Sequence, residues 1–254
     1  DQQVVFFAVG FETTAPATAL SLLQACELGL KNFSVLVSHV RVLPAMQALM
    51  LDPGNRVQGF LAAGHVCTIT GFEMYADFAK QFCVPVVVTG FEPVDLLQGI
   101  LECITQLESG TANVSNSYGR SVTRFGNPDA QRVVESVYQI DDRAWRGFGV
   151  IPAGGYRLRD EYAAYDAQRR FVMTNKRSTD GFEVVERCKA GDVLSGRLKP
   201  CDCPEFGKAC TPDSPLGAPM VSSEGACAAY YRYQRGSVLG WLRRSGPAIG
   251  RFRL

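Results

Sequence analysis

The side chains best suited to chemistry are five cysteines that fall close together toward the end of the chain. Cys188, Cys203, Cys210 and Cys227 are separated by 14, 6 and 16 residues, and Cys201 precedes Cys203 by two positions. Four thiolates supplied by loops are what a tetrahedral zinc ion or a 4Fe-4S cluster requires. Structural zinc sites usually carry paired C-x(2–4)-C hairpins, which this sequence lacks, so the long spacings favour iron–sulfur while zinc stays open. Cys201 is then a spare thiol or an alternative ligand, and a purely structural role for all five is the remaining interpretation.

The other four cysteines are scattered through the first 103 residues among apolar neighbours. The odd total of nine cysteines, and a start without a secretory signal pattern, argue against a disulfide framework. We therefore expect a reducing compartment, the cytoplasm. Cys67 could serve as a ligand or a nucleophile, although a small buried hydrophobic residue is the simpler interpretation.

A second set of candidates comes from the tripeptide Gly-Phe-Glu, which occurs three times in the front part of the chain and ends there in Glu12, Glu73 and Glu92. The first and third copies directly follow predicted strands. Open α/β sheets usually bind their ligands at the carboxyl ends of the strands. Glu12 and Glu92, with Thr13 and Thr14, are therefore candidate catalytic residues in such a crevice. The alternative is that the copies are recurrent turns, because glycine permits a tight turn and Glu is favoured in the first turn of a helix.

The two histidines of the chain, His39 and His65, each follow a predicted strand. An isolated histidine is more often a hydrogen-bonded structural residue. Because His65 shares the predicted strand edge with Glu12 and Glu92, we expect it to be a catalytic residue that donates hydrogen bonds or handles protons. The sequence contains neither a dinucleotide fingerprint nor a P-loop, so a nucleotide cofactor has no support.

Alternating strand and helix patterns across the front of the chain must position these side chains. Continuous apolar runs bounded by turn residues predict strands, the first of them buried on both faces. Periodic apolar segments between them predict helices, the first of which begins after a Thr14 cap. This alternation is typical of an α/β fold with a mostly parallel sheet and helices on both faces. The predicted strands cover residues 3–9, 33–37, 57–62 and 84–89, and the predicted helices cover residues 15–28, 44–51, 72–82 and 94–107.

The back part of the chain has a different character. From about Trp145 the alternation stops and turn-rich sequence follows, with one helix candidate over residues 159–171. We predict two domains: an α/β domain over residues 1–150 and a loop-rich, cysteine-bearing iron–sulfur domain over residues 151–254. Residues 232–254 carry six arginines and no acid, which is typical of a solvated tail, with contact to an acidic partner as the alternative.

Composition excludes several classes of protein. The 254 residues include 26 basic and 25 acidic side chains, for a net charge of +1. Nucleic-acid binding needs clustered positive charge, which this balance does not provide over the whole chain. No apolar run approaches the roughly 20 residues that span a bilayer. We therefore expect neither nucleic acid nor a membrane as a partner.

Taken together, the motifs resemble one family, the NiFe-hydrogenase maturation proteins HypD. The resemblance covers nearly the whole chain, from Val4 to about Tyr233, and its last two motifs are highly specific. The motifs are GFETTAP at residues 10–16, GFEPVD at 90–95, WRGFG at 145–149, DCPEFGK at 202–208, CTP at 210–212 and MVSSEGAC at 220–227.

The resemblance implies a scaffold on which the Fe(CN)2CO group of NiFe hydrogenases is assembled, rather than a classical turnover enzyme. It implies two partners, a HypC-type chaperone and a HypE-type protein that delivers cyanide. It also implies a 4Fe-4S cluster, and matching of positions makes Cys188, Cys203, Cys210 and Cys227 its ligands. The family fold has two similar α/β halves with a cleft between them and a cluster-bearing domain, and residues 1–150 correspond to the second half.

The departures from the family pattern are informative. Family members begin with a further α/β region that bears a Cys-Gly-His motif and a Gly-Pro-Gly-Cys-Pro-Val-Cys motif. Neither motif occurs here, so the chain looks truncated and is expected to lack the cysteines that hold the iron being modified. A zinc-stabilised α/β binding module and an independent redox enzyme are the two alternatives to the assembly scaffold.

Overall fold

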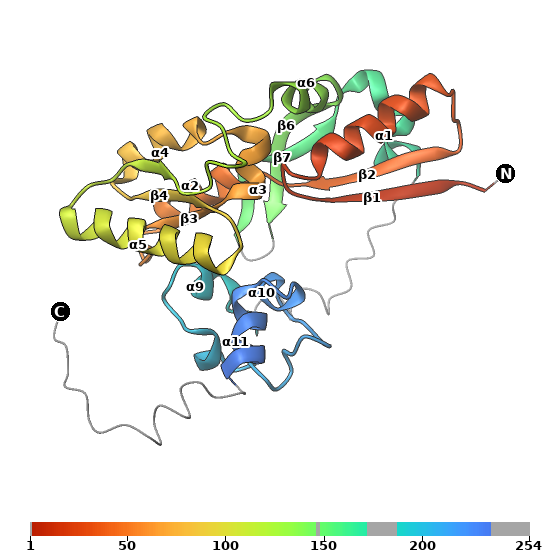
Figure 1. Ribbon diagram of the computed structural model, residues 1–254. Coiled ribbons are helices and arrows are strands. Elements are labelled where there is room, and N and C mark those ends of the chain that lie inside the picture. The colour runs from red at the N-terminus through yellow and green to blue at the C-terminus, as the bar shows by residue number, and fades with distance from the viewer. Residues whose placement is uncertain (1, 146–147, 172–186, 235–254) are drawn as a thin grey trace. The chain divides into compact units, whose positions relative to one another are not determined.

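The computed structural model describes residues 2–145, 148–171 and 187–234. The chain divides into two compact units, Asp1–Asn175 and Lys176–Leu254 (Figure 1). The sequence predicts a boundary after residue 150, but that position lies inside a strand of the first unit. The division instead falls after Asn175. The arginine-rich tail beyond Gln234 and two residues of the WRGFG motif lie outside the described residues.

The first unit alternates strands and helices over most of its length and then adds a hairpin. Its strands are β1 (Val4–Gly10), β2 (Phe33–His39), β3 (Phe60–Ala63), β4 (Val86–Thr89), β5 (Val114–Asn116), β6 (Tyr138–Trp145) and β7 (Gly149–Leu158). Its helices are α1 (Ala15–Glu27), α2 (Val42–Leu51), α3 (Gly64–Thr70), α4 (Ala76–Phe82), α5 (Pro93–Ser109), α6 (Pro128–Val137) and α7 (Ala167–Arg170), with 3-10 turns η1 (Glu73–Tyr75) and η2 (Asp160–Tyr165).

The strands form three small sheets, which corrects our prediction of one sheet. β1 and β2 pair in parallel, β3, β4 and β5 form a parallel sheet in the order β3-β4-β5, and β6 and β7 form an antiparallel hairpin. The β2 segment meets the hairpin, through an isolated bridge between Val40 and Gly155. β2 pairs with β1 in one sheet, and β3 pairs with β4 in another. The fold is therefore α/β with parallel sheets and helices, as predicted, but the parallel strands are divided between two sheets.

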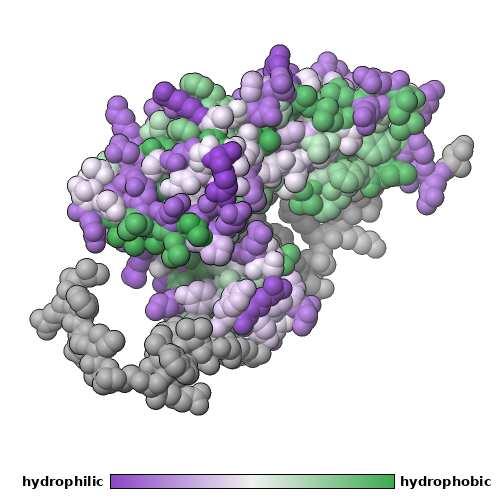
Figure 2. Space-filling view, in the orientation of Figure 1, coloured by the Kyte–Doolittle hydropathy of each residue, from purple (hydrophilic) through white to green (hydrophobic). Residues whose placement is uncertain are grey.

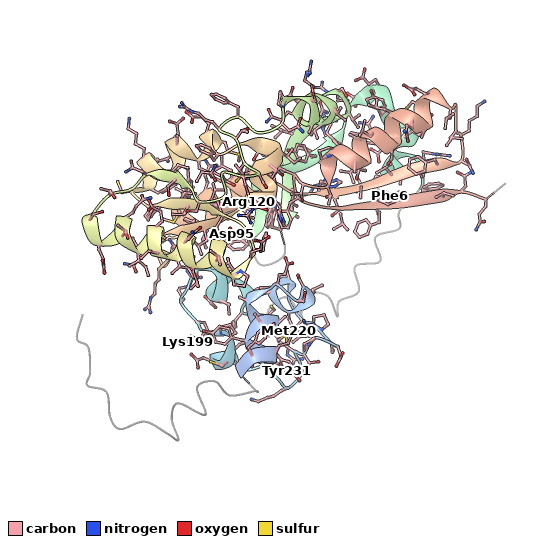
Figure 3. The ribbon with its side chains drawn as sticks, in the orientation of Figure 1. Phe6, Asp95, Arg120, Lys199, Met220 and Tyr231 are labelled. Carbon is pink, nitrogen blue, oxygen red and sulfur yellow. The ribbon has the colours of Figure 1, made fainter. Side chains whose placement is uncertain are left out.

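β1 is the clearest departure from the predicted pattern of burial. The sequence predicts a strand buried on both faces, yet Phe6 is 48% exposed and Val9 is 58% exposed (Figure 3). The cause is that β1 lies at the edge of a two-stranded sheet, and in the part of the chain that the structure describes β2 is its only strand partner. Helix α5 also presents an exposed apolar face, which forms the green band at the lower left of Figure 2.

Two separate apolar cores stabilise the first unit. One packs Leu22 of α1 against Val35 of β2 and Tyr138 of β6. The other surrounds β4 and includes Tyr75 and Phe78. Each parallel sheet thus has a core of its own. Among the described helices, none is both long enough and apolar enough to cross a bilayer.

The second unit consists of short helices joined by turns. They are α9 (Ala190–Leu194), the 3-10 turn η3 (Pro200–Asp202), α10 (Ala218–Val221) and α11 (Ala226–Gln234). Its small core contains Cys210, Met220 and Ala228 (Figure 3). Phe206 and Tyr231 pack against this core. Their two rings meet edge to face, with centroids 5.9 Å apart.

Two backbone turns of the first unit pass very close to each other. Gly71, at the end of α3, has a φ of +76°, and Gly126, before α6, has a φ of +71°. A Cβ atom at Gly71 would clash with the backbone of Arg124 and Phe125. The backbone N–H of Asn127 donates to the Ile69 carbonyl at 3.0 Å. These contacts hold the segment before α6 against α3.

We expect Gly71→Ala to lower the free energy of unfolding by about 2 kcal/mol or more, because it adds a clash to an unfavourable positive φ. Gly110→Ala is the matched control, since Gly110 has a φ of +67° but an added Cβ meets nothing within 4 Å. The control should cost only about 1 kcal/mol. Urea unfolding of both variants checks this prediction, and equal losses would contradict the importance of the close approach.

Candidate functional site

Four of the five clustered cysteines converge in the second unit. Cys188, Cys203, Cys210 and Cys227 line one cavity. They come from the segment before α9, the residue after η3, a turn, and the start of α11, so four separate local segments each supply one thiol. Cys201 lies on η3, is exposed, and is not among the cavity-lining residues. The geometry thus separates Cys201 from the other four cysteines.

The surroundings of these thiols are apolar and closely packed. The backbone N–H of Leu216 donates to Cys210 Sγ at 3.5 Å, and hydrogen bonds to sulfur are one means of tuning an iron–sulfur site. A Cβ atom at Gly217 would clash with Cys188 Sγ, so glycine leaves the room that this thiol occupies. Burial raises the pKa of the Cys227 thiol to about 11, with a further contribution from the three other thiols of the set.

The four thiols share a cavity but do not form a site for one ion. Within residues 2–145, 148–171 and 187–234, no group of three or more His, Cys, Asp or Glu side chains is placed to hold one metal ion. A tetrahedral zinc needs all four sulfurs about 2.3 Å from one point. Four thiolates are also the ligand set of a 4Fe-4S cluster.

A second group of candidate residues gathers at the carboxyl end of the β3-β4-β5 sheet. His65 is the second residue of α3 and is exposed. Its ring centroid lies 4.8 Å from that of Phe91 and 6.3 Å from that of Tyr118. Phe91 follows β4 and Tyr118 follows β5, so residues from three strand ends meet here. The two aromatic rings thus hold the exposed imidazole at this edge of the sheet.

Glu92 belongs to the same edge of the sheet, where an arginine restrains it. Arg120 donates to Glu92 at 3.0 Å and to both carboxylate oxygens of Asp95 at 2.7 and 2.6 Å (Figure 3). The Arg120 guanidinium also lies 4.5 Å from the centroid of the Tyr118 ring. The hydrogen bonds from Arg120 lower the pKa of the buried Asp95 carboxyl. Glu92 thus helps to hold Arg120 and Tyr118 beside His65.

The structure places Glu12 in a different network from Glu92. Glu12 follows β1 in the other parallel sheet and is 3% exposed. Its Oε1 accepts a hydrogen bond at 2.9 Å from the backbone N–H of Val42, the first residue of α2. Burial raises the pKa of the Glu12 carboxyl. Glu12 therefore caps α2. The sequence predicts Glu12 and Glu92 in one crevice, but the structure places them in separate hydrogen-bond networks.

Thr14 is the residue before α1, as predicted, but its hydroxyl makes no capping hydrogen bond to that helix. It donates to the Phe11 carbonyl at 3.3 Å and lies 3.0 Å from His39 Nε2. His39 is fully buried at the end of β2, and burial, with a contribution from Arg143, lowers its pKa to about 4. Thr14 and His39 thus join the ends of β1 and β2, while the half-buried Thr13 lies beside them in the chain.

Sequence reasoning missed the residues that connect this edge. Asp95 is the last residue of the GFEPVD motif, but no nearby residue in the sequence indicates that it pairs with Arg120. Tyr118 and Arg120 belong to no motif. The three Gly-Phe-Glu copies also differ, since Glu73 pairs with Arg124 at 2.6 Å and both side chains are largely exposed. Two of the three glutamates therefore anchor the same segment after β5, through Arg120 and Arg124.

Comparison with known proteins gives consistent matches. A family model described as "HypD: Hydrogenase formation hypA family" matches residues 1–234. The Hydrogenase maturation factor HypD of Rhizobium leguminosarum bv. viciae is 45% identical over 242 residues, which cover 92% of this chain and 62% of that protein. The protein of the same name from Rhodobacter capsulatus is 45% identical over 233 residues, covering 91% and 62%. That of Escherichia coli K12 is 41% identical over 235 residues, covering 92% and 62%. The chain thus spans less than two thirds of the length of these curated relatives.

Proposed function

This chain belongs to the HypD family of hydrogenase formation proteins, and on that premise we propose that it acts in hydrogenase maturation, as part of the scaffold on which Fe(CN)2CO is assembled. The proposal includes a 4Fe-4S cluster held by Cys188, Cys203, Cys210 and Cys227. The observation that supports it most strongly is the convergence of these four thiols on one cavity.

The two sites have different parts in this proposal. The cluster, when bound, supplies reducing equivalents. At the edge of the β3-β4-β5 sheet, His65 acts as a hydrogen-bond donor or as a general acid–base group in the delivery of cyanide, while Arg120 and its two carboxylate partners keep Tyr118 in place. The iron that receives CN⁻ and CO is the substrate and needs soft thiolate ligands. The two cysteine motifs that the resemblance assigns to that iron are not in this sequence, so we propose that other parts of the scaffold supply those thiols.

We further propose that the scaffold works with a HypC-type chaperone and a HypE-type cyanide-delivering protein in the cytoplasm. The cysteines are odd in number, and four of them are scattered among apolar neighbours in the first 103 residues. This pattern does not suggest a disulfide framework, which supports a reducing compartment.

Complementation tests the proposed function. An Escherichia coli strain that lacks its own HypD would express this chain joined to the part of that relative which the chain does not cover. We expect NiFe-hydrogenase activity to return. A fusion protein that accumulates in folded form but restores no activity would contradict the proposed function.

His65→Gln in the same fusion should reduce hydrogenase activity by about a hundredfold, the usual range for loss of a proton-transfer group. Gln81→Ala, at an exposed position of α4, is the control and should leave the activity near that of the parent. Both variants should unfold at nearly the same temperature as the parent, because the His65 side chain is exposed. Full activity in the glutamine variant would remove His65 from the mechanism.

A further inference from the structure

The first unit contains a cavity that the proposed function does not use. Its volume is about 410 Å³, and its polar lining includes Glu12, Arg41, Gln131, Tyr156 and Arg159. Small-molecule sites in proteins usually occupy about 300–1,000 Å³ and combine apolar walls with a few polar groups. The apolar part of this wall comes from side chains such as Leu43, Ile69 and Met74. Its size and lining are therefore those of a ligand site.

One buried oxygen in this wall needs a hydrogen-bond donor. Glu12 is 3% exposed, and its Oε1 already accepts from the Val42 N–H at 2.9 Å. Its Oε2 is buried and has no hydrogen-bond partner among the residues that the structure describes. A buried carboxylate oxygen without a donor is costly, so such atoms are usually satisfied by a ligand or by water.

The donors of the wall are directed elsewhere. Arg41 Nη1 donates to the Ala153 carbonyl at 3.0 Å, and Arg159 Nε donates to the Glu135 carbonyl at 2.6 Å. The amide of Gln131 donates to two backbone carbonyls, both at 2.7 Å. These contacts use donors of the wall elsewhere, and Glu12 Oε2 remains an acceptor without a partner among the described residues.

We propose that this cavity binds a small molecule through a planar group that carries N–H donors, a guanidinium or a primary amide, with Glu12 Oε2 as the acceptor. Both groups present two N–H bonds in one plane, which matches a carboxylate. The charged guanidinium and the neutral amide share this planar N–H geometry. The wall carries two basic side chains, Arg41 and Arg159, and a second acidic one, Glu135, besides Glu12. The charge of the wall therefore does not choose between a guanidinium and an amide, and the two probes separate these cases.

The test measures binding of methylguanidinium and of propionamide to the full chain by ligand-observed NMR and titration calorimetry. We expect at least one probe to bind the parent protein. Glu12→Gln keeps an oxygen for the Val42 N–H but replaces Oε2 with an NH2 group, so the affinity should fall by about tenfold or more. Glu73→Gln changes the corresponding residue of another Gly-Phe-Glu copy, outside the cavity, and should bind like the parent.

A second variant keeps the test decisive if Glu12→Gln does not fold. Met74→Phe narrows the cavity from the segment after α3 and should also weaken binding, while circular dichroism reports an unchanged fold. Failure of both probes to bind the parent, or equal binding by the parent and Glu12→Gln, would overturn the proposal. Neither readout depends on iron or on hydrogenase activity, so this result is independent of the proposed function.

Discussion

Replacing Cys203 or Cys227 with serine is expected to reduce the iron content of the anaerobically purified protein from about four atoms per chain to less than about one. Each substitution removes one of the four thiols that line the cavity of the second unit. A serine hydroxyl is a hard, weakly acidic ligand and does not replace a thiolate on iron. Iron and acid-labile sulfide analysis, together with the visible absorption of the cluster, measures the effect.

Cys201→Ser is the matched control for these variants. Cys201 is two residues from Cys203 in the sequence, but it is exposed and does not line the cavity. The control should keep the iron, the sulfide and the colour of the parent protein. Loss of iron from Cys201→Ser, with iron retained in Cys203→Ser, would show that Cys201 is the ligand. That result would contradict the choice of Cys203 from its place in the cavity.

Asp95→Asn is expected to have the largest effect at the edge of the β3-β4-β5 sheet. Asp95 is buried and accepts two hydrogen bonds from Arg120, whereas Glu92, the other partner of Arg120, is 75% exposed. The substitution removes the negative charge that balances the Arg120 guanidinium, and it removes one of the two oxygens that accept from Arg120. Tyr118, which packs against Arg120, then loses its fixed position beside His65. A displacement of about 1 Å near reacting groups can cost about a hundredfold in rate. We therefore expect a loss of that order in hydrogenase maturation, measured by complementation.

The same pair predicts a pH dependence of stability. Because Arg120 lowers the pKa of Asp95 in the folded state, the ion pair contributes fully above the ordinary Asp pKa of about 3.9, and the contribution is lost as the pH falls through the lower folded value. Asp95→Asn should show a lower urea midpoint at pH 7 and a flatter decline in acid than the parent. Glu73→Gln breaks the exposed pair with Arg124 and should change the midpoint much less. Equal effects of the two substitutions would show that burial of Asp95 is unimportant.

Local sequence signals predicted several regular elements of the first 107 residues, but not α3, β5, α6 or β6. α1 and α5 begin within one residue of their predicted starts, because Pro16 and Pro93 fix the first turn and the apolar spacing defines the helix. The four cysteines that line one cavity also stand out in the sequence, because they cluster in a loop-rich segment. In both cases the information lies within a short stretch of chain.

The features that sequence reasoning missed depend on distant contacts. Residues 149–158 contain four glycines and prolines and were interpreted as turns, yet they form β7 because they pair with β6. The Gly155 position allows this strand to approach His39, where a Cβ atom would lie 2.6 Å from the His39 carbonyl oxygen. No local pattern predicts such an approach.

The three copies of Gly-Phe-Glu show the same limit at the level of single side chains. Identical tripeptides place Glu12 in a buried cap, Glu73 in an exposed ion pair and Glu92 beside Arg120. The difference comes from residues 25 or more positions away in the chain, since Val42, Arg124 and Arg120 supply the partners. Composition and spacing carry no information about these pairings.

The most direct test of the central claim is the iron, acid-labile sulfide and zinc content of the full chain purified without oxygen. A 4Fe-4S cluster held by the four thiols that share one cavity predicts iron and sulfide in equal amounts, about four of each per chain, with little zinc. One zinc atom per chain without sulfide would contradict the account and would instead indicate a zinc-stabilised module.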